Sequence, residues 1–321
     1  MAPDDSEDRL DPEVATALAL AARNRRLDLA TAQLVSGLRE NGIDSMLMKG
    51  PATARVLYHD EIRIYSDIDL LVSQQEFEQA AALASRLGFV KSMSPGRFRR
   101  WLDAKTEGKD RQLWRAQDGL SLELHRSFHL LPTSMNLLEL VSGHREAMQL
   151  HAVEIPVPNP ATVALLCLLH LKTGALKGEP TDRLAADLNR AIDRLSAASW
   201  AETAALAYTM GITESCVAAL RERGGGLGAS LSRELFPGVR PDRWLTAHLR
   251  TGSVMAYKIM NFRSRTWTSR LLWMLTWPIP PLRPTYSELQ LAQINSWKRG
   301  KGWSLRDFVM AVRVAARPNR P

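Results

Sequence analysis

Cysteine is scarce in this chain, with two residues in 321. Cys167 and Cys216 each lie inside an apolar run, as small core side chains do, so they supply neither a disulfide framework nor a cysteine metal cluster. The sequence also lacks any uncharged apolar stretch near the ~18 residues that a membrane span needs. Its acidic first residues lack the basic and apolar regions of a secretory signal. We therefore expect a cytoplasmic protein that is not integral to a membrane.

Two common catalytic signatures are missing as well. The chain contains no Gly-x-x-x-x-Gly-Lys-Ser/Thr loop and no Gly-x-Ser-x-Gly elbow. These absences exclude a P-loop NTPase and a serine hydrolase of the elbow type. What is present is a globular composition, 45% hydrophobic and 24% charged, in a chain whose length favours two domains.

The formal net charge of +8 is unevenly distributed. Residues 240–321 hold 15 Lys and Arg against three acids, a net +12, together with six of the nine tryptophans. Residues 1–239 hold 27 basic and 31 acidic residues, a net −4. The basic, Trp-rich tail can bind RNA, a membrane surface or a partner protein, or it can form a helical core with a solvated face. A second basic run lies between Arg97 and Arg115.

The first 130 residues alternate between helix and strand patterns. Pro12 begins an apolar pattern at helical spacing that continues to Glu40 and stops at Asn41-Gly42. Residues 43–48 predict a short buried strand, followed by the turn Lys49-Gly50-Pro51 and a helix. The remaining expected elements are a strand over 62–72, a helix over 74–87, a strand from Phe89, a strand with a mobile loop within 95–118, a strand over 120–128, helices over 162–173, 181–197 and 198–220, and a flexible joint at 224–228.

Asp67 and Asp69 form the most informative pattern in the chain. Residues two apart in a strand point to one face, so the two carboxylates project together. Like charges side by side cost stability, and a pair of divalent ions ~3.5 to 4 Å apart, as used in phosphoryl transfer, is the usual reason to keep them. Mg²⁺ prefers such oxygen ligands. Glu123 and His125 are also two apart on one strand face, so Glu123 can supply a third carboxylate.

A zinc site at His125 and His129 is not expected. Their spacing of four would suit a pair of ligands on a helix, but the segment alternates like a strand and has no further ligand nearby in the sequence.

Several short motifs resemble those of the polymerase-β-type nucleotidyltransferases. The matching segments are Lys49-Gly50-Pro51-Ala52, Arg63, Ser66 to Val72, Leu87-Gly88-Phe89 and Leu122-Glu123-Leu124-His125. Within that superfamily the chain is most similar to the nucleotidyltransferase-like proteins often encoded with lasso-peptide and other natural-product pathways. The similarity continues into the helical half and covers most of the chain, although only the Asp-x-Asp block is specific.

The resemblance implies an α+β fold, in which a mixed or antiparallel nucleotidyltransferase sheet with flanking helices precedes a mainly α-helical C-terminal domain. It implies that Asp67, Asp69 and Glu123 are catalytic and bind two Mg²⁺ ions. The implied reaction transfers a nucleoside monophosphate from a nucleoside triphosphate, with ATP as the expected donor, to a hydroxyl on a peptide or small natural product.

Triphosphate contact is carried over to Lys49, Gly50, Arg63 and Ser66. The broader superfamily has a Gly-Ser pair where this chain has Gly-Pro, and proline offers neither an amide nor a hydroxyl donor. Arg63 can instead form an ion pair with a neighbouring acid.

The base that frees the acceptor hydroxyl is a metal-bound carboxylate, Asp187 or His170. The apolar pattern around His170 is also typical of a core histidine, and Asp187 can pair with Arg183 on its own helix.

The expected organisation has four parts. These are an N-terminal helical segment at 1–42, a nucleotidyltransferase catalytic domain at 43–130, a helical domain at 131–235 and a basic, Trp-rich helical region at 236–321. Two other functions fit the same residues. One is a toxin-like nucleotidyltransferase that modifies protein or tRNA, and the other is an inactive scaffold that binds a nucleotide or a partner.

Overall fold

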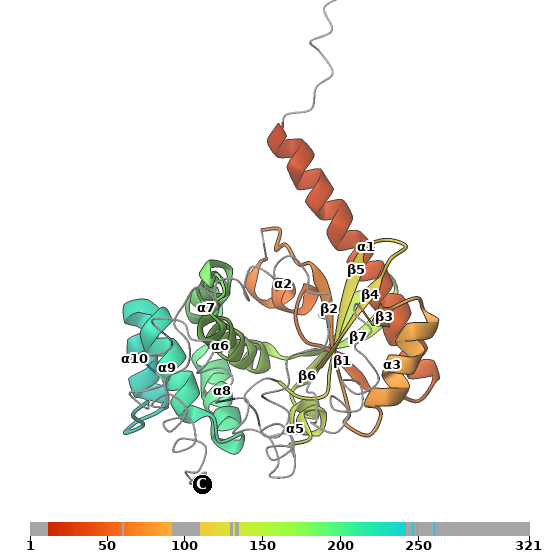
Figure 1. The fold of residues 1–321 in the computed structure, drawn as a ribbon. Coiled ribbons are helices and arrows are strands. Elements are labelled where there is room, and N and C mark those ends of the chain that lie inside the picture. The colour runs from red at the N-terminus through yellow and green to blue at the C-terminus, as the bar shows by residue number, and fades with distance from the viewer. Residues whose placement is uncertain are drawn as a thin grey trace, which may run out of the picture. The chain divides into compact units, whose positions relative to one another are not determined.

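A computed structural model describes residues 12–59, 61–91, 110–128, 131, 135–241, 246, 249 and 260. The chain divides into two compact units (Figure 1). Of the described residues, the first unit comprises 12–59, 61–91, 110–126 and 137–163, and the second comprises 127–128, 131, 135–136, 164–241, 246, 249 and 260. Among the described helices, none has the length and apolar character needed to cross a membrane.

The first unit is built on a mixed five-stranded sheet in the order β1-β2-β5-β4-β3. The strands are β1 (Ser45–Leu47), β2 (Asp67–Val72), β3 (Val90–Lys91), β4 (Asp110–Arg115) and β5 (Leu120–His125). The central pair, β2 and β5, is parallel, whereas the other neighbours are antiparallel. The helices of this unit are α1 (Pro12–Glu40), α2 (Pro51–Leu57), α3 (Phe77–Arg86) and α5 (Leu137–Ser142).

One face of the sheet forms the core with α1 and α3. Alternate residues of the central strands, such as Ile68 and Leu70 on β2, are buried there together with Leu34 and Leu38 of α1 and Phe77 of α3. Burial of such side chains stabilises the fold by roughly 2 kcal/mol each. Because strand residues alternate between faces, fixing Ile68 and Leu70 in this core directs Asp67 and Asp69 to the opposite face.

A hairpin of β6 (Arg145–Leu150) and β7 (Val153–Pro158) lies beside β1. Its turn uses His151 and Ala152, both with positive φ. Arg55 of α2 forms an ion pair with Glu146 and donates to the carbonyl of Ala147 at 3.0 Å, so the hairpin is tied to the helix that follows β1. This hairpin is not among the elements predicted from the sequence.

The second unit is helical in its described part. Its helices are α6 (Pro160–Lys177, of which 164–177 belong to this unit), α7 (Asp182–Arg194), α8 (Ala197–Thr209), α9 (Thr213–Arg223) and α10 (Gly225–Leu235). On α7, Leu184, Leu188 and Ala191 are buried at helical spacing. Together with the mixed sheet of the first unit, these helices confirm the predicted α+β fold class. The four-part division of the chain stays a prediction.

Several element boundaries differ from the sequence-based expectation. The predicted helix over 12–40 is confirmed, but the strand expected over 62–72 begins at Asp67, because its partner β5 begins only at Leu120. The helix expected over 198–220 is split into α8 and α9 by Gly211, whose φ of 64° belongs to the left-handed region that ends helices. The joint expected at 224–228 is instead the start of α10.

The basic run and the tail are described only in part. The residues of the basic run between Arg97 and Lys109 lie outside the described residues, as does nearly all of the Trp-rich tail. Arg111 forms a bidentate ion pair with Glu78 of α3, in which its two terminal guanidinium nitrogens lie 3.0 and 2.6 Å from the carboxylate oxygens. Arg115 pairs with Asp118 at 2.6 Å.

Candidate active site

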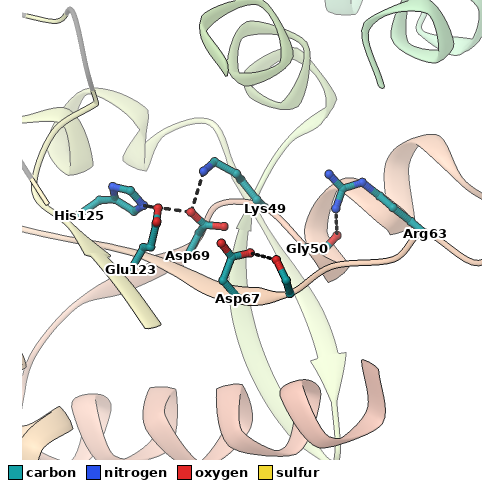
Figure 2. Close-up of polar contacts among 8 residues, drawn as sticks. Lys49, Gly50, Arg63, Asp67, Asp69, Glu123 and His125 are labelled. Carbon is teal, nitrogen blue, oxygen red and sulfur yellow. Dashed lines mark hydrogen bonds and ion pairs between the residues drawn. The ribbon is translucent and has the colours of Figure 1, made fainter. Parts of the chain in front are cut away.

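The parallel pairing of β2 with β5 brings the acidic residues together. In this register Asp69 lies opposite Glu123, and Leu71 lies opposite His125. Both strands send their intervening apolar residues into the core, so the polar residues share the other face. Figure 2 shows the side chains of Asp67, Asp69 and Glu123 pointing away from the helix that runs beneath the strands. Asp69 is 3% exposed, whereas Asp67 and Glu123 are half-buried.

Lys49 reaches this cluster from the end of β1. The strand pairs with β2, and the ladder continues one step further through the amide of Met48, which donates to the carbonyl of Asp69 at 2.9 Å. The next residue is Lys49, and its Nζ lies 2.7 Å from Asp69 Oδ1 (Figure 2). Its position is therefore set by the β1–β2 register, which places an ammonium group beside the buried carboxylate.

His125 completes the cluster from the last residue of β5. Its ring is buried, with Nε2 at 3.0 Å from Asp69 Oδ1 and 3.6 Å from Glu123 Oε2. Among the described residues, one group of His, Cys, Asp and Glu side chains is compact enough to hold a metal ion. It comprises Asp69, Glu123 and His125, whose donor atoms all lie within 4.8 Å of one another.

Lys49, Asp69, Glu123 and His125 lie close enough to shift one another's pKa values. Burial by itself would raise the pKa of Asp69, but the charge of Lys49 and the hydrogen bond from His125 outweigh it and lower the pKa. Burial opposes the charge of Lys49, yet the charges of Asp69 and Glu123 together raise the pKa of the ammonium. Burial and the nearby charge of Asp69 raise the pKa of Glu123. At neutral pH the site therefore contains an ionised Asp69 beside a charged Lys49.

Gly50 forms the turn between Lys49 and α2. Its φ of 57° and ψ of −117° are accessible to glycine and costly for other residues, and a Cβ at this position would lie 3.4 Å from the ring of Tyr65. Arg63 is 5% exposed and its guanidinium lies 3.5 Å from the carbonyl oxygen of Gly50 (Figure 2). Its guanidinium carbon lies over the ring of Tyr58, 5.9 Å from the ring centre, within the range of a cation–π interaction. The buried Arg63 side chain therefore stabilises the turn through its contact with the Gly50 carbonyl.

Helix α1 anchors the loop that carries Arg63. Asn24 donates a hydrogen bond of 2.9 Å to the carbonyl of Arg63. Two residues further along the loop, the hydroxyl of Tyr65 donates to Asp28 Oδ1 at 2.6 Å. Since Tyr65 and Arg63 both contact Gly50, the long N-terminal helix holds the Lys49-Gly50 turn in place indirectly.

The predicted site residues of the first unit lie in and around this cluster. Lys49, Asp69 and Glu123 form the cluster, and Asp67 lies on the same strand two residues before Asp69. Ser66 contacts Asp67, with its hydroxyl 3.4 Å from Oδ1. Gly50 and Arg63 form the adjoining turn.

Asp187 and His170 belong to the second unit, on α7 and α6, and Asp187 is 4% exposed. A role for either one as the base stays a prediction.

His125 is not among the metal ligands predicted from the sequence. A zinc pair with His129, which lies outside the described residues, is not expected because no further ligand is close in the sequence. The structure brings Asp69, 56 residues away along the chain, within hydrogen-bond distance of the ring. The available signal was the strand alternation that placed His125 on the same face as Glu123.

The chain belongs to a nucleotidyltransferase family. Residues 9–222, more than half of the chain, match the model of the family described as "Uncharacterised nucleotidyltransferase". The matched region contains both strands of the cluster and the Lys49-Gly50 turn. None of the curated proteins compared with the chain matches it.

Two solved structures are similar to the chain at low identity. An antigenic nucleotidyltransferase-like protein from Paracoccidioides brasiliensis is 16% identical, with a TM-score of 0.35, over 58% of this chain and 88% of that one. The antibiotic-resistance factor ANT(2'')-Ia is 12% identical, with a TM-score of 0.39, over 62% of this chain and 96% of that one. Both TM-scores lie below 0.5, so family membership rests on the family model alone.

Proposed function

We propose that the protein transfers a nucleoside monophosphate from a nucleoside triphosphate to a hydroxyl acceptor, with release of pyrophosphate. The observation that carries this proposal is the shared face of β2 and β5, where Asp67, Asp69 and Glu123 gather beside Lys49. Membership of a nucleotidyltransferase family supports it. The cytoplasm, where nucleoside triphosphates are available, is the proposed setting.

Divalent ions fit this face because its donors are mainly carboxylate oxygens, which Mg²⁺ prefers. Asp67, Asp69 and Glu123 are the residues proposed to hold two Mg²⁺ ions. Ions bound there would neutralise charge on the phosphates and on the attacking oxygen. The donor atoms of Asp69, Glu123 and His125 lie within 4.8 Å of one another, which supports at least one such position.

The residues beside the carboxylates are proposed to orient the triphosphate. Lys49 supplies a positive charge, and the raised pKa of its ammonium keeps it protonated at neutral pH. Gly50 allows phosphate to approach the backbone without a side chain in the way. Ser66 offers a hydroxyl next to Asp67. Arg63 is buried against the Gly50 carbonyl, so we propose that it acts on the nucleotide through the shape of this turn.

The acceptor proposed is a peptide or a small natural product, on the strength of the motif resemblance. A protein or tRNA acceptor would use the same phosphate chemistry, and the basic residues of the tail would suit it. In either case the acceptor hydroxyl needs positioning and loss of its proton, for which a metal-bound carboxylate, Asp187 or His170 is the proposed base.

Label transfer from α-labelled ATP tests this proposal. The full chain is incubated with Mg²⁺, labelled ATP and a cell extract, and pyrophosphate release is measured together with labelled products. Asp67→Asn combined with Glu123→Gln should abolish transfer. Glu78→Gln removes an acid on α3, which packs on the other face of the sheet, and should leave transfer intact.

Retained folding of the double variant, checked by circular dichroism, separates lost chemistry from lost structure. Transfer that persists in this variant would refute the assignment of the carboxylates. If the wild-type protein binds ATP with Mg²⁺ in calorimetry but yields no transfer with any extract, the scaffold function replaces the enzyme.

A further inference from the structure

His125 occupies an unusual place for a histidine that serves only the core. It is 3% exposed, yet its Nε2 points between two carboxylates, at 3.0 Å from Asp69 Oδ1 and 3.6 Å from Glu123 Oε2 (Figure 2). Its backbone position on β5 makes this orientation a consequence of strand alternation, since Glu123 lies two residues before it. β2 and β5 therefore bring the imidazole nitrogen of His125 close to the carboxylates of Asp69 and Glu123.

The spacing of these atoms matches that of metal ligands. Ligands at about 2.1 Å from an ion lie about 3.0 Å apart when adjacent in octahedral geometry and about 3.4 Å apart in tetrahedral geometry. The observed 3.0 Å equals the octahedral separation, and the observed 3.6 Å is slightly longer than the tetrahedral one. A hydrogen bond accounts for the first distance, but the 3.6 Å separation from Glu123 exceeds a normal hydrogen bond. Both distances are compatible with ligands of one ion.

The net charge on this face of β2 and β5 also favours binding of a cation. Asp67, Asp69 and Glu123 carry three negative charges when ionised, and Lys49 returns one positive charge. With His125 neutral, as a histidine ligand must be, the face keeps a net negative charge that divalent ions would offset. Such a balance favours occupancy, since uncompensated like charges at close range are costly.

We propose that His125 is a metal ligand and that Asp69, Glu123 and His125 form a mixed nitrogen and oxygen site that prefers Mn²⁺ to Mg²⁺. This inference deepens the proposed nucleotidyl transfer and rests on it for its role. Imidazole suits first-row transition ions, whereas Mg²⁺ favours oxygen ligands and water. The nitrogen donor therefore assigns a metal preference to the site that its carboxylates alone would not give.

Pulsed electron paramagnetic resonance of bound Mn²⁺ tests the ligand directly and without nucleotide. The full chain loaded with Mn²⁺ should show nitrogen-14 modulation from a coordinated imidazole. Incorporation of nitrogen-15 histidine should convert that signal to nitrogen-15 frequencies in the unaltered protein. The His125→Asn variant should lose the signal, whereas His59→Asn, at an exposed position after α2, should keep it.

Competition between the two ions gives a second measurement. Displacement of Mn²⁺ by Mg²⁺ should require at least about tenfold less Mg²⁺ in His125→Asn than in the wild-type protein, because the variant lacks the ligand that favours Mn²⁺. The His59→Asn control should match the wild-type protein.

The results separate this inference from the proposed function. Bound Mn²⁺ without a histidine nitrogen signal in the wild-type protein would overturn the ligand role of His125, and Mg²⁺-dependent transfer in the same preparation would leave the proposed function standing. A signal that persists unchanged in His125→Asn would equally overturn the assignment. A nitrogen signal without any transfer would support the site and count against the enzyme.

Discussion

Lys172 provides a test of the electrostatics inside the helical unit. It lies on α6 with 2% exposure, and its ammonium donates to the hydroxyl of Ser215 on α9. Burial lowers the pKa of Lys172 from an ordinary 10.5 to about 8, although Cys216 and Glu214 oppose the shift. The folded protein therefore bears a cost for holding this charge at neutral pH.

The magnitude follows from the two pKa values. At about 1.4 kcal/mol per pKa unit, the charged Lys172 costs the folded state about 3 kcal/mol at pH 7. Below pH 8 both states are protonated and the cost is complete. Above pH 8 the folded state releases the proton while the unfolded state keeps it to about 10.5, so stability rises with pH. Burial raises the pKa of Cys216 from 9.0 to about 12, which opposes this rise above pH 9.

Urea unfolding of Lys172→Met at pH 7 and pH 9 measures the effect. The variant should be more stable than the wild-type protein by about 2 kcal/mol at pH 7, after about 1 kcal/mol is subtracted for the lost hydrogen bond to Ser215. This advantage should shrink by about 1.4 kcal/mol at pH 9. Hydrogen exchange in peptides from α6 reports the same change locally.

Lys177→Met is the matched control on the same helix. Lys177 is 31% exposed and lies 3.6 Å from Glu179, so its removal should change the unfolding free energy by less than about 0.5 kcal/mol at either pH. A Lys172→Met protein that is less stable than the wild type at pH 7, with a difference that does not vary with pH, would refute the reasoning.

Four further substitutions have defined outcomes. Asp69→Asn should lower the unfolding free energy by about 3 kcal/mol, because it leaves Lys49 without its buried partner. Asp67 is half-buried, so Asp67→Asn should lower the unfolding free energy by less than about 1 kcal/mol. Equal losses of the two variants in thermal unfolding would contradict this contrast. Gly50→Ala places a side chain at φ 57° and should reduce ATP binding in calorimetry, with unaltered affinity as the contrary result. At the start of α8 the hydroxyl of Ser196 accepts a hydrogen bond of 3.1 Å from the backbone amide of Ser199. Ser196→Ala removes this cap and should lower the unfolding free energy in urea by about 1 kcal/mol. An unchanged unfolding free energy would show that the cap does not stabilise the protein.

Local signals in the sequence predicted most elements near the site. The helix over 12–40 has an apolar pattern and a glycine stop, and the strand-turn-helix around Lys49-Gly50 has a buried strand followed by a proline suited to a first helical turn. The hairpin over 145–158 was missed because Pro156 and Pro158 argue against a strand. The break at Gly211 was missed because glycine also occurs inside helical patterns, and only its φ marks the helix end.

The sequence by itself determined that Asp67 and Asp69 share a face, since alternation is a local property of any strand. Its motifs also pointed to the nucleotidyltransferase family that the match over residues 9–222 confirms. Which distant residues join the two carboxylates was decided by tertiary structure. The parallel β2–β5 register sets Glu123 and His125 beside Asp69, and the β1–β2 ladder delivers Lys49. Those registers depend on how apolar residues far apart in the chain pack into one core, which no local pattern encodes.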